Sequence, residues 1–297
     1  ESVEEVIAIS ERSGIPAMIT HFKIRGKKNW GRSAALIRRI DEARAAGIDV
    51  TMAQYPYTAG STFLHVVIPP WYHSRGVDGL LRALREERGA IKHDLDTRMD
   101  WENFSQSVGW EKIFVSSVVS EANQPCVGKS ISQIAAERGH ADPADAAFDL
   151  LVEEQLAVGM ISFGLDEADI TAIMRHPAVS FITDGLMSGR PHPRAYATYP
   201  RILGRYVREQ GVLSLEEAVR KMTSLPARKI RLRNKGVIAE GYDADLVVFD
   251  PDTVIDKNSY DDPRVHPAGI AHVLVNGVFV VEDAALTGAR PGRVIRD

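Results

Sequence analysis

Two residues whose side chains can bind a metal or carry a proton, His21 and Asp184, each end an apolar run of the sequence. The histidine closes "IPAMITH" (residues 15–21), and the aspartate closes "AVSFITD" (residues 178–184). Imidazole nitrogen and carboxylate oxygen are both ligands that zinc accepts. Taken singly, a histidine at a strand end is commonly a hydrogen-bonded structural residue, and an aspartate before a glycine is commonly a turn residue. Together they predict a divalent metal shared between two strand ends.

The elements that would position these residues follow a parallel α/β pattern, in which amphipathic helices stopped by glycine feed short apolar strands. The helices are expected at residues 3–13 and 33–46, and the strands at residues 15–21, 48–57, 158–164 and 178–185. Met160 and Phe163 are expected to fill the interior of a barrel. In such a barrel the catalytic groups lie at the C-terminal ends of the strands, because the βα loops form the open mouth there. Both His21 and Asp184 hold that position.

The rest of the chain predicts two domains. The α/β rhythm breaks over residues 64–112, which we interpret as an inserted lid that contains one charged helix over residues 77–95. One long helix is expected over residues 215–230. After residue 233 the sequence changes to strand pairs around glycine and Asn-Gly turns, "GVIAEGYDADLVVFD" and "AHVLVNGVFVVED". The predicted boundaries are therefore a partial barrel over residues 1–232 and part of a small β-sandwich domain over residues 233–297.

Composition excludes several classes of function. The 297 residues carry a net charge of −4, and the basic residues are spread along the chain, which argues against a nucleic-acid partner. No apolar run approaches the ~20 residues of a membrane span. The single cysteine, Cys126, rules out an intramolecular disulfide. A cytoplasmic setting is expected. The chain opens on a helix pattern without an initiating methionine, so we expect that sequence precedes it.

Five motifs occur in an order that resembles a known family. They are "THFKIRGKKNWG", "QYPYTAGST", "FITDG", "RPHPRAYATYPRILGRYVRE" and "GYDADLVVFDPDTV". Together they closely resemble the N-acyl-D-amino acid deacylases, or D-aminoacylases, of the amidohydrolase superfamily. The resemblance is weakest over residues 64–112. It implies an α/β fold, the C-terminal part of a distorted (β/α)8 TIM-like barrel, joined to part of a β-sandwich domain built from both chain ends.

The resemblance also implies an activity and a role for each matching residue. The activity is the zinc-dependent hydrolysis of an N-acyl-D-amino acid, a small-molecule substrate, to a D-amino acid and a carboxylate. His21 matches a ligand of Zn²⁺. Asp184 matches the catalytic aspartate, which acts as general base and acid, and with His21 it is expected to bind the metal. Four further residues match substrate-binding positions. Lys23 and Tyr55 match residues that contact the substrate's carboxylate or its scissile carbonyl, and Ser61 lies in the loop that helps to hold the carboxylate. Arg194 matches the arginine that pairs with the substrate's α-carboxylate.

Departures from the family pattern concern the metal. In that family a cysteine and two histidines hold the zinc, and an HxH pair lies on the first strand. This chain has neither the HxH pair nor a matching cysteine, and Cys126 lies in the wrong segment to replace the thiolate. Catalytic zinc usually takes three protein ligands. We therefore expect a missing part of about 180 residues, roughly the first four or five strands at ~35 residues per βα unit, in the same polypeptide or in a second chain. The oligomeric state stays open.

Alternative interpretations of the same residues remain open. Lys23 fits a solvated loop together with Arg25 and its neighbours, Tyr55 and Tyr57 fit packing positions, and Arg194 fits a structural bridge to a nearby carboxylate. A cyclic amide hydrolase of the hydantoinase or dihydropyrimidinase type shares the barrel and the aspartate, but its substrates need no arginine for a free carboxylate. A non-catalytic homologue or fragment is the third reading. The "HFK" pattern and Arg194 favour the deacylase.

Overall fold

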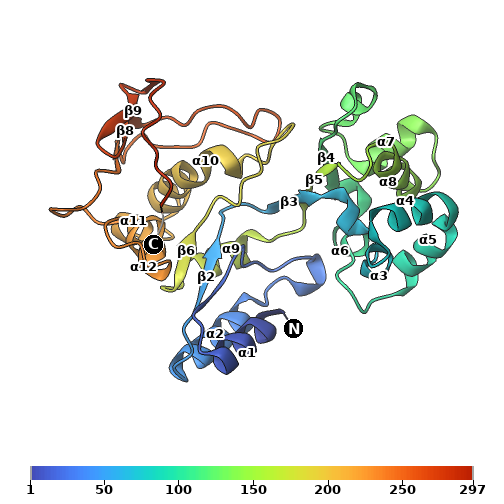
Figure 1. The fold of residues 1–297 in the computed structure, drawn as a ribbon, viewed down its shortest axis with the longest axis horizontal. Helices are drawn as coiled ribbons and strands as arrows, with labels where there is room; N and C mark the ends of the chain where they lie inside the picture. The colour runs from blue at the N-terminus through green and yellow to red at the C-terminus, as the bar shows by residue number, and fades with distance from the viewer. Residues whose placement is uncertain (1, 296–297) are drawn as a thin grey trace.

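A three-stranded parallel sheet lies at the centre of the larger of two lobes in the computed structural model, which describes residues 2–295 (Figure 1). Its order is β1-β2-β6, where β1 is Ala17–Ile19, β2 is Val50–Gln54 and β6 is Val179–Phe181. Both pairings are parallel. All five residues of β2 are buried, as expected for a parallel strand covered on both faces. The predicted parallel α/β arrangement is present in this sheet.

Helices α1 (Ser2–Ser13), α2 (Ser33–Ala45) and α9 (Glu167–Met174) cover one face of this sheet. Apolar side chains alternate along the strands, so that Val50 and Met52 of β2 point to this face. The first two helices confirm the sequence-based prediction, and each is followed by a glycine with positive φ. This core holds the parallel strands in register.

The opposite face packs against the helices that follow β6. They are α10 (Arg194–Arg201), a wider π-helical continuation (Ile202–Glu209), α11 (Leu215–Met222) and α12 (Ser224–Lys229). Phe181 at the end of β6 belongs to this second core. The prediction of one long helix over residues 215–230 is wrong, because the backbone turns out of helical geometry at Thr223 (φ −127°, ψ −88°).

The second lobe, called the helical lobe (residues 59–163), contains an antiparallel sheet of order β3-β5-β4. Its strands are β3 (Ala59–Phe63), β4 (Ile113–Ser117) and β5 (Gly159–Phe163), and β5 pairs antiparallel with both neighbours. The expectation that residues 158–164 form another parallel strand is therefore wrong. A short buried apolar run looks alike in a covered sheet of either kind, so periodicity could not separate the two.

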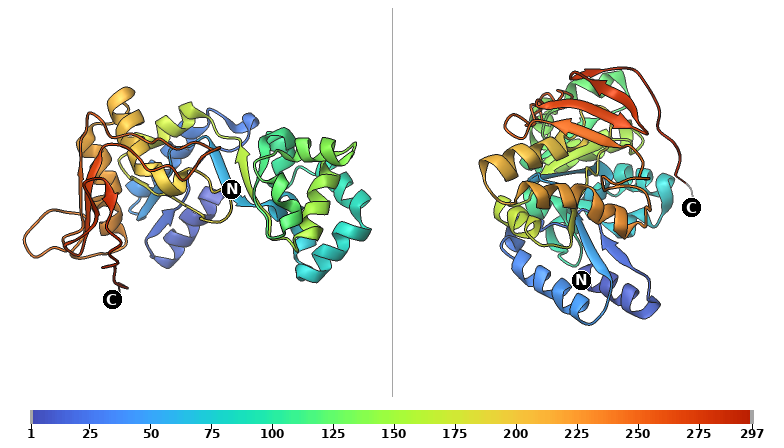
Figure 2. Two further views of the ribbon diagram at one scale, coloured as in Figure 1. Left: turned by 90° about the horizontal axis from the view of Figure 1, so that it is seen from above. Right: turned by 90° about the vertical axis from the view of Figure 1, so that its left-hand side faces the viewer.

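Six helices complete the helical lobe, and Figure 2 shows it standing apart from the larger lobe. They are α3 (Pro70–His73), α4 (Gly76–Glu86), α5 (Arg88–Thr97), α6 (Phe104–Val108), α7 (Ile131–Arg138) and α8 (Pro143–Glu153). The charged helix expected over residues 77–95 is two helices, α4 and α5, divided at Glu87 (φ −117°, ψ 22°). Met160 packs in the core of this lobe, not in a barrel, and Phe163 packs edge-on against Phe114. Short 3₁₀ turns occupy Lys27–Asn29, Leu64–Val67, Trp110–Lys112 and Glu121–Cys126.

A buried carboxylate, Glu154 at the end of α8, anchors the loop that follows β4. It accepts hydrogen bonds from the backbone N–H groups of Val119 (2.6 Å) and Ser120 (2.9 Å), from the Ser120 hydroxyl, and from the amide of Asn123 (2.7 Å). These donors favour the ionised form against the effect of burial, and they lower the pKa of Glu154 to about 2.

Replacing Glu154 with glutamine is expected to lower the free energy of unfolding at pH 7 by about 3 kcal/mol, because folding lowers the pKa of this carboxyl to about 2. Because the folded pKa lies below the unfolded one, this stabilisation is present above about pH 4.5 and is lost as the pH falls towards 2. Urea titrations between pH 2 and 7 measure the effect. Glu153→Gln, which loses only an exposed pair with Arg138, is the matched control and should stay within about 1 kcal/mol of the wild type. Equal losses in the two variants would contradict the assignment.

A four-stranded antiparallel sheet of order β10-β9-β8-β7 lies towards the C-terminus, at the upper left of Figure 1. Its strands are β7 (Leu246–Phe249), β8 (Ile270–Val275), β9 (Val278–Glu282) and β10 (Ala285–Leu286). The predicted Asn-Gly turn joins β8 to β9, with positive φ at Asn276 and Gly277. The predicted strand pair within residues 236–250 is wrong, because only β7 forms there and it pairs with β8.

No helix within residues 2–295 is both long enough and apolar enough to cross a membrane.

A candidate active site at the ends of three parallel strands

Three polar side chains follow the C-terminal ends of neighbouring strands in the parallel sheet. His21 comes after β1, Tyr55 directly follows β2, and Asp184 comes after β6. Both outer segments are tied to the central strand, because the Phe22 N–H donates to the Ala53 carbonyl (2.8 Å) and the Ile182 N–H donates to the Gln54 carbonyl (3.0 Å). The order β1-β2-β6 therefore places His21 and Asp184 on either side of Tyr55.

His21 and Asp184 also share an uncommon backbone conformation. Their φ angles are +43° and +47°, in the left-handed region that residues other than glycine rarely adopt. Such strain persists only where the surrounding structure enforces it, and it is frequent at functional sites. The two residues predicted as a pair from the sequence thus leave their strands by the same sharp turn.

The Tyr55 ring is buried, and two basic side chains lie against it. The guanidinium carbon of Arg194 is 4.4 Å from the ring centroid, and the ammonium of Lys23 is 5.4 Å from it. Burial raises the pKa of the Tyr55 phenol, so the hydroxyl stays protonated. This hydroxyl has no hydrogen-bond partner in the described part of the chain, which leaves one buried donor free for a ligand.

Arg194 is only 1% exposed and forms an ion pair with Asp184, with 2.9 Å between Nη2 and Oδ2. Nη2 also donates to the backbone carbonyl of Ser61 (3.2 Å), whereas Nε and Nη1 are buried and have no partner within residues 2–295. The structural interpretation of Arg194, as a bridge to a nearby carboxylate, describes this contact correctly. The unused donors of this planar guanidinium can also receive a second carboxylate, which binds in a bidentate way when it shares Nη2 with Nη1 or with Nε.

His192 holds the loop that carries Arg194. Its Nδ1 accepts the backbone N–H of Arg194 (3.0 Å), so Nε2 carries the proton and donates to the carbonyl of Ala59 (3.0 Å). Burial, reinforced by the charge of Arg194, holds the pKa of His192 well below its ordinary value. This neutral histidine links the start of α10 to the start of β3, and so it positions Arg194 over Tyr55.

Lys23 lies against His21, since Nζ is 3.0 Å from both the ring Nδ1 and the backbone carbonyl of that histidine. Burial, and secondly the charge of Arg25, lowers the pKa of Lys23 to about 7. Burial also lowers the pKa of His21, followed by the charge of Lys23. A neutral imidazole is the form that binds metals.

The site offers part of the ligand set that a zinc ion needs. His21 and Asp184 are ligands of the right chemistry. No group of three histidine, cysteine, aspartate or glutamate side chains within residues 2–295 could hold a metal, and Cys126 is buried in the helical lobe. The described residues therefore offer two donors, not the three that a catalytic zinc takes.

The six residues predicted from the sequence are thus placed as follows. His21, Lys23, Tyr55, Asp184 and Arg194 gather at the strand ends, and Ser61 joins them through its backbone carbonyl. Their catalytic and binding roles remain proposals.

Arg25 belongs to the same cluster. From the sequence it is predicted only as part of a solvated loop around Lys23. Its side chain is 15% exposed, and its guanidinium lies 3.9 Å from the centroid of the Phe104 ring. Burial lowers the pKa of Arg25. The sequence does contain a signal that Arg25 lies on the same side as His21 and Lys23. Polar residues at positions 21, 23 and 25 alternate with the buried apolar residues Phe22 and Ile24.

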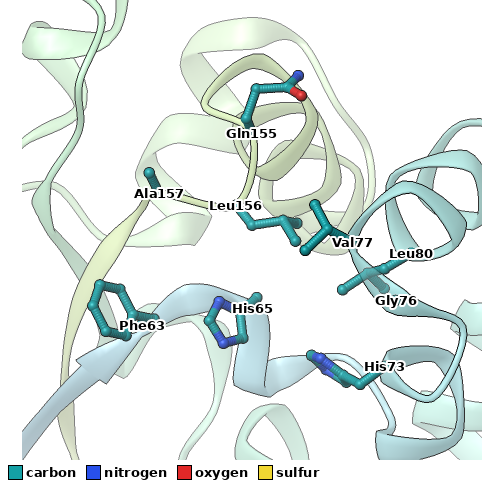
Figure 3. Close-up of a pocket in the computed structure, with 9 residues that line it drawn as sticks. All are labelled: Phe63, His65, His73, Gly76, Val77, Leu80, Gln155, Leu156 and Ala157. Atoms are coloured by element: carbon teal, nitrogen blue, oxygen red, sulfur yellow. The ribbon is translucent and has the colours of Figure 1, made fainter.

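A cavity of about 410 Å³ lies elsewhere, in the helical lobe, and none of the six predicted residues lines it (Figure 3). His65 stands between Phe63, whose ring stacks on it at 5.7 Å between centroids, and His73, at 5.5 Å. The walls are mainly apolar. The candidate site and this cavity of the helical lobe are therefore separate.

Comparison with known proteins identifies the family of this chain. The sequence model of the amidohydrolase family (Amidohydro_3) matches residues 125–281, which is more than half of the chain. An N-acyl-D-glutamate deacylase of Alcaligenes xylosoxydans xylosoxydans is 38% identical over 296 residues, which are 99% of this chain and 51% of that protein. A D-aminoacylase of the same organism is 36% identical over 295 residues, with the same coverage of 99% and 51%.

Solved structures give the same result. The crystal structure of an N-acyl-D-glutamate deacylase from Bordetella bronchiseptica, complexed with zinc and a phosphonate mimic of the tetrahedral intermediate, is similar with a TM-score of 0.78 and 35% identity over 99% of this chain and 52% of that one. A D-aminoacylase structure is similar with a TM-score of 0.74, 35% identity, and coverage of 97% and 51%. The chain spans about half the length of the relatives that it matches. The resemblance inferred from the five motifs is confirmed, and the chain belongs to the amidohydrolase family.

Proposed function

We propose that this protein hydrolyses the amide bond of N-acyl-D-amino acids, releasing a D-amino acid and a carboxylate. The observation that carries the proposal is the buried Arg194, which pairs with Asp184 at the strand ends and keeps two donors unused. A substrate with a free α-carboxylate supplies the missing partner. A cyclic amide has no such carboxylate and would leave these donors unsatisfied inside the protein, which disfavours a hydantoinase-like activity.

The proposed domain organisation follows the family. Residues 1–232 would be the C-terminal part of a distorted barrel, in which residues 64–112 are an inserted lid within the helical lobe. Residues 233–297 would be part of a β-sandwich domain. The parallel order β1-β2-β6 supports the barrel, and the antiparallel order β10-β9-β8-β7 supports the sandwich.

Zinc is the metal we propose for this site, and His21 and Asp184 are the residues of this chain that would hold it. The remaining ligands would lie in the part of the relatives' length that this chain does not span, on the same polypeptide or on a second chain. When bound, zinc acts as a Lewis acid and lowers the pKa of a coordinated water to about 7.

The residues of this chain would divide the remaining work. The substrate carboxylate replaces Asp184 on Nη2 of Arg194 and binds in a bidentate way through Nη2 and one of the two unused donors, Nη1 or Nε. This exchange frees the Asp184 carboxylate to take a proton from the attacking water and to deliver it to the departing amine nitrogen. The Tyr55 hydroxyl donates to the carbonyl oxygen as negative charge develops on it. Lys23, whose pKa is about 7, adds a second positive charge for the substrate carboxylate when it is protonated.

The proposal is tested by measuring amine release from the D and L enantiomers of N-acetyl amino acids, with the zinc content determined in parallel. We expect hydrolysis of D substrates only, abolished by a chelator and restored by zinc. Hydrolysis of L substrates at the same rate would contradict the proposed stereochemistry. Full zinc occupancy without amine release from any N-acetyl-D-amino acid would favour the non-catalytic alternative.

A further inference from the structure

The polar side chains after β1 continue past Lys23 to a third cation. Beyond the strand the chain stays extended enough for alternation to persist, with Phe22 and Ile24 buried in the apolar core and Arg25 on the side of Lys23. The Gly26 N–H donates to the carbonyl of Gly164 (2.8 Å), which fixes this segment against the end of β5. Arg25 is therefore held at the junction between the strand ends and the helical lobe.

Two ligand-binding groups converge beside Gly60, on β3. A side-chain carbon added to this glycine would lie 3.1 Å from Nη2 of Arg25 and 3.4 Å from the hydroxyl oxygen of Tyr55. Because Gly60 has no side chain, the guanidinium and the phenol can both lie close to the backbone of β3, where even a methyl group would be crowded. A carboxylate bound near this glycine would meet the Arg25 guanidinium, while the Tyr55 hydroxyl, which has no partner within residues 2–295, stays the donor to the scissile carbonyl oxygen.

The cations around Tyr55 are weakly neutralised. Arg25 and Arg194 bring two positive charges, Lys23, with a pKa of about 7, adds a third when it is protonated, and the carboxylates paired with them among residues 2–295 are those of Asp184 and Glu102. Glu102 is 68% exposed and lies 3.5 Å from Nη1 of Arg25, a loose contact that contributes little in water. A substrate with a single carboxylate engages Arg194 and leaves Arg25 without a buried partner.

We propose that Arg25 is a specificity-determining residue that binds a second substrate carboxylate beside Gly60, so that the preferred substrates are N-acyl derivatives of acidic D-amino acids. This inference rests on the proposed deacylase function. The α-carboxylate goes to Arg194, and the side-chain carboxylate goes to Arg25 in place of Glu102. The Phe104 ring, which lies against the Arg25 guanidinium, keeps this guanidinium oriented while the substrate carboxylate replaces Glu102.

The test compares N-acetyl-D-glutamate with N-acetyl-D-glutamine, which has the same shape without the second charge. We expect the wild type to prefer the glutamate compound. Arg25→Gln should raise the KM for N-acetyl-D-glutamate by roughly 10- to 100-fold, which is the effect expected from losing a hydrogen bond to a charged group, and kcat should change little. The KM for the glutamine compound should stay within about twofold. Lys28→Gln, which removes an exposed charge of the same loop, is the matched control and should change neither KM.

Glu102→Gln gives a test of opposite sign, because it removes the competing carboxylate and should lower the KM for the glutamate compound by about two- to threefold. Equal losses on both substrates in Arg25→Gln would indicate a merely structural arginine and overturn the inference, as would a wild-type preference for the glutamine compound.

Calorimetric binding of the two compounds to the same variants separates this inference from the proposed reaction. Tighter binding of the glutamate compound that depends on Arg25, without hydrolysis, would support the subsite and contradict the deacylase. Hydrolysis with no effect of Arg25→Gln on either binding or KM would support the deacylase and contradict the Arg25 subsite.

Discussion

Replacing Asp184 with asparagine is expected to lower kcat for N-acyl-D-amino acids by about 10²- to 10⁴-fold, because the amide cannot take up and return the proton. KM is not expected to rise, since asparagine no longer competes with the substrate carboxylate for Arg194. Steady-state kinetics with N-acetyl-D-glutamate, at matched zinc content, measure both parameters.

The matched control for this variant is Asp261→Asn, which removes a carboxylate that is 95% exposed and paired with Arg190. It should change kcat by less than about twofold, as expected for an exposed ion pair. Retention of more than a tenth of the activity in Asp184→Asn would remove this residue from the proton transfer and with it the proposed mechanism.

Replacing Arg194 with glutamine is expected to raise the KM for N-acetyl-D-amino acids by roughly 10- to 100-fold, because the variant loses the charged donors for the α-carboxylate. Arg194→Lys should recover only part of this loss, since an ammonium has no planar fork for two carboxylate oxygens. Because Arg194 is almost fully buried, thermal unfolding of both variants should be measured alongside the kinetics.

A substrate without the carboxylate is the control for binding. The carboxamide analogue of the same N-acetyl-D-amino acid should be hydrolysed slowly by the wild type, and Arg194→Gln should not slow it further. If the variant loses the same factor on the acid and on the amide while remaining folded, then Arg194 shapes the site and does not bind the α-carboxylate.

The strand ends could be predicted from sequence because the signal is local. An apolar run of the length of a strand, followed by a single histidine or aspartate, marks both the strand and the residue that leaves it. Parallel pairing then brings those ends to one edge of the sheet, as β1, β2 and β6 show. The same reasoning was wrong for residues 158–164, because a buried run does not encode the direction of its neighbours.

Sequence by itself determined the family, the short helices and strands around the parallel sheet, and which side chains stand at the strand ends, since these depend on residue type and spacing along a few turns of chain. Only the tertiary structure decided which charges meet. Arg194 reaches the Ser61 carbonyl 133 residues away, and Arg25 meets Glu102 and Phe104 of the helical lobe. The physical reason is that the electrostatic energy of a buried cation depends on every charged or polar group that folding brings within a few ångströms of it. Spacing along the sequence does not record those distances.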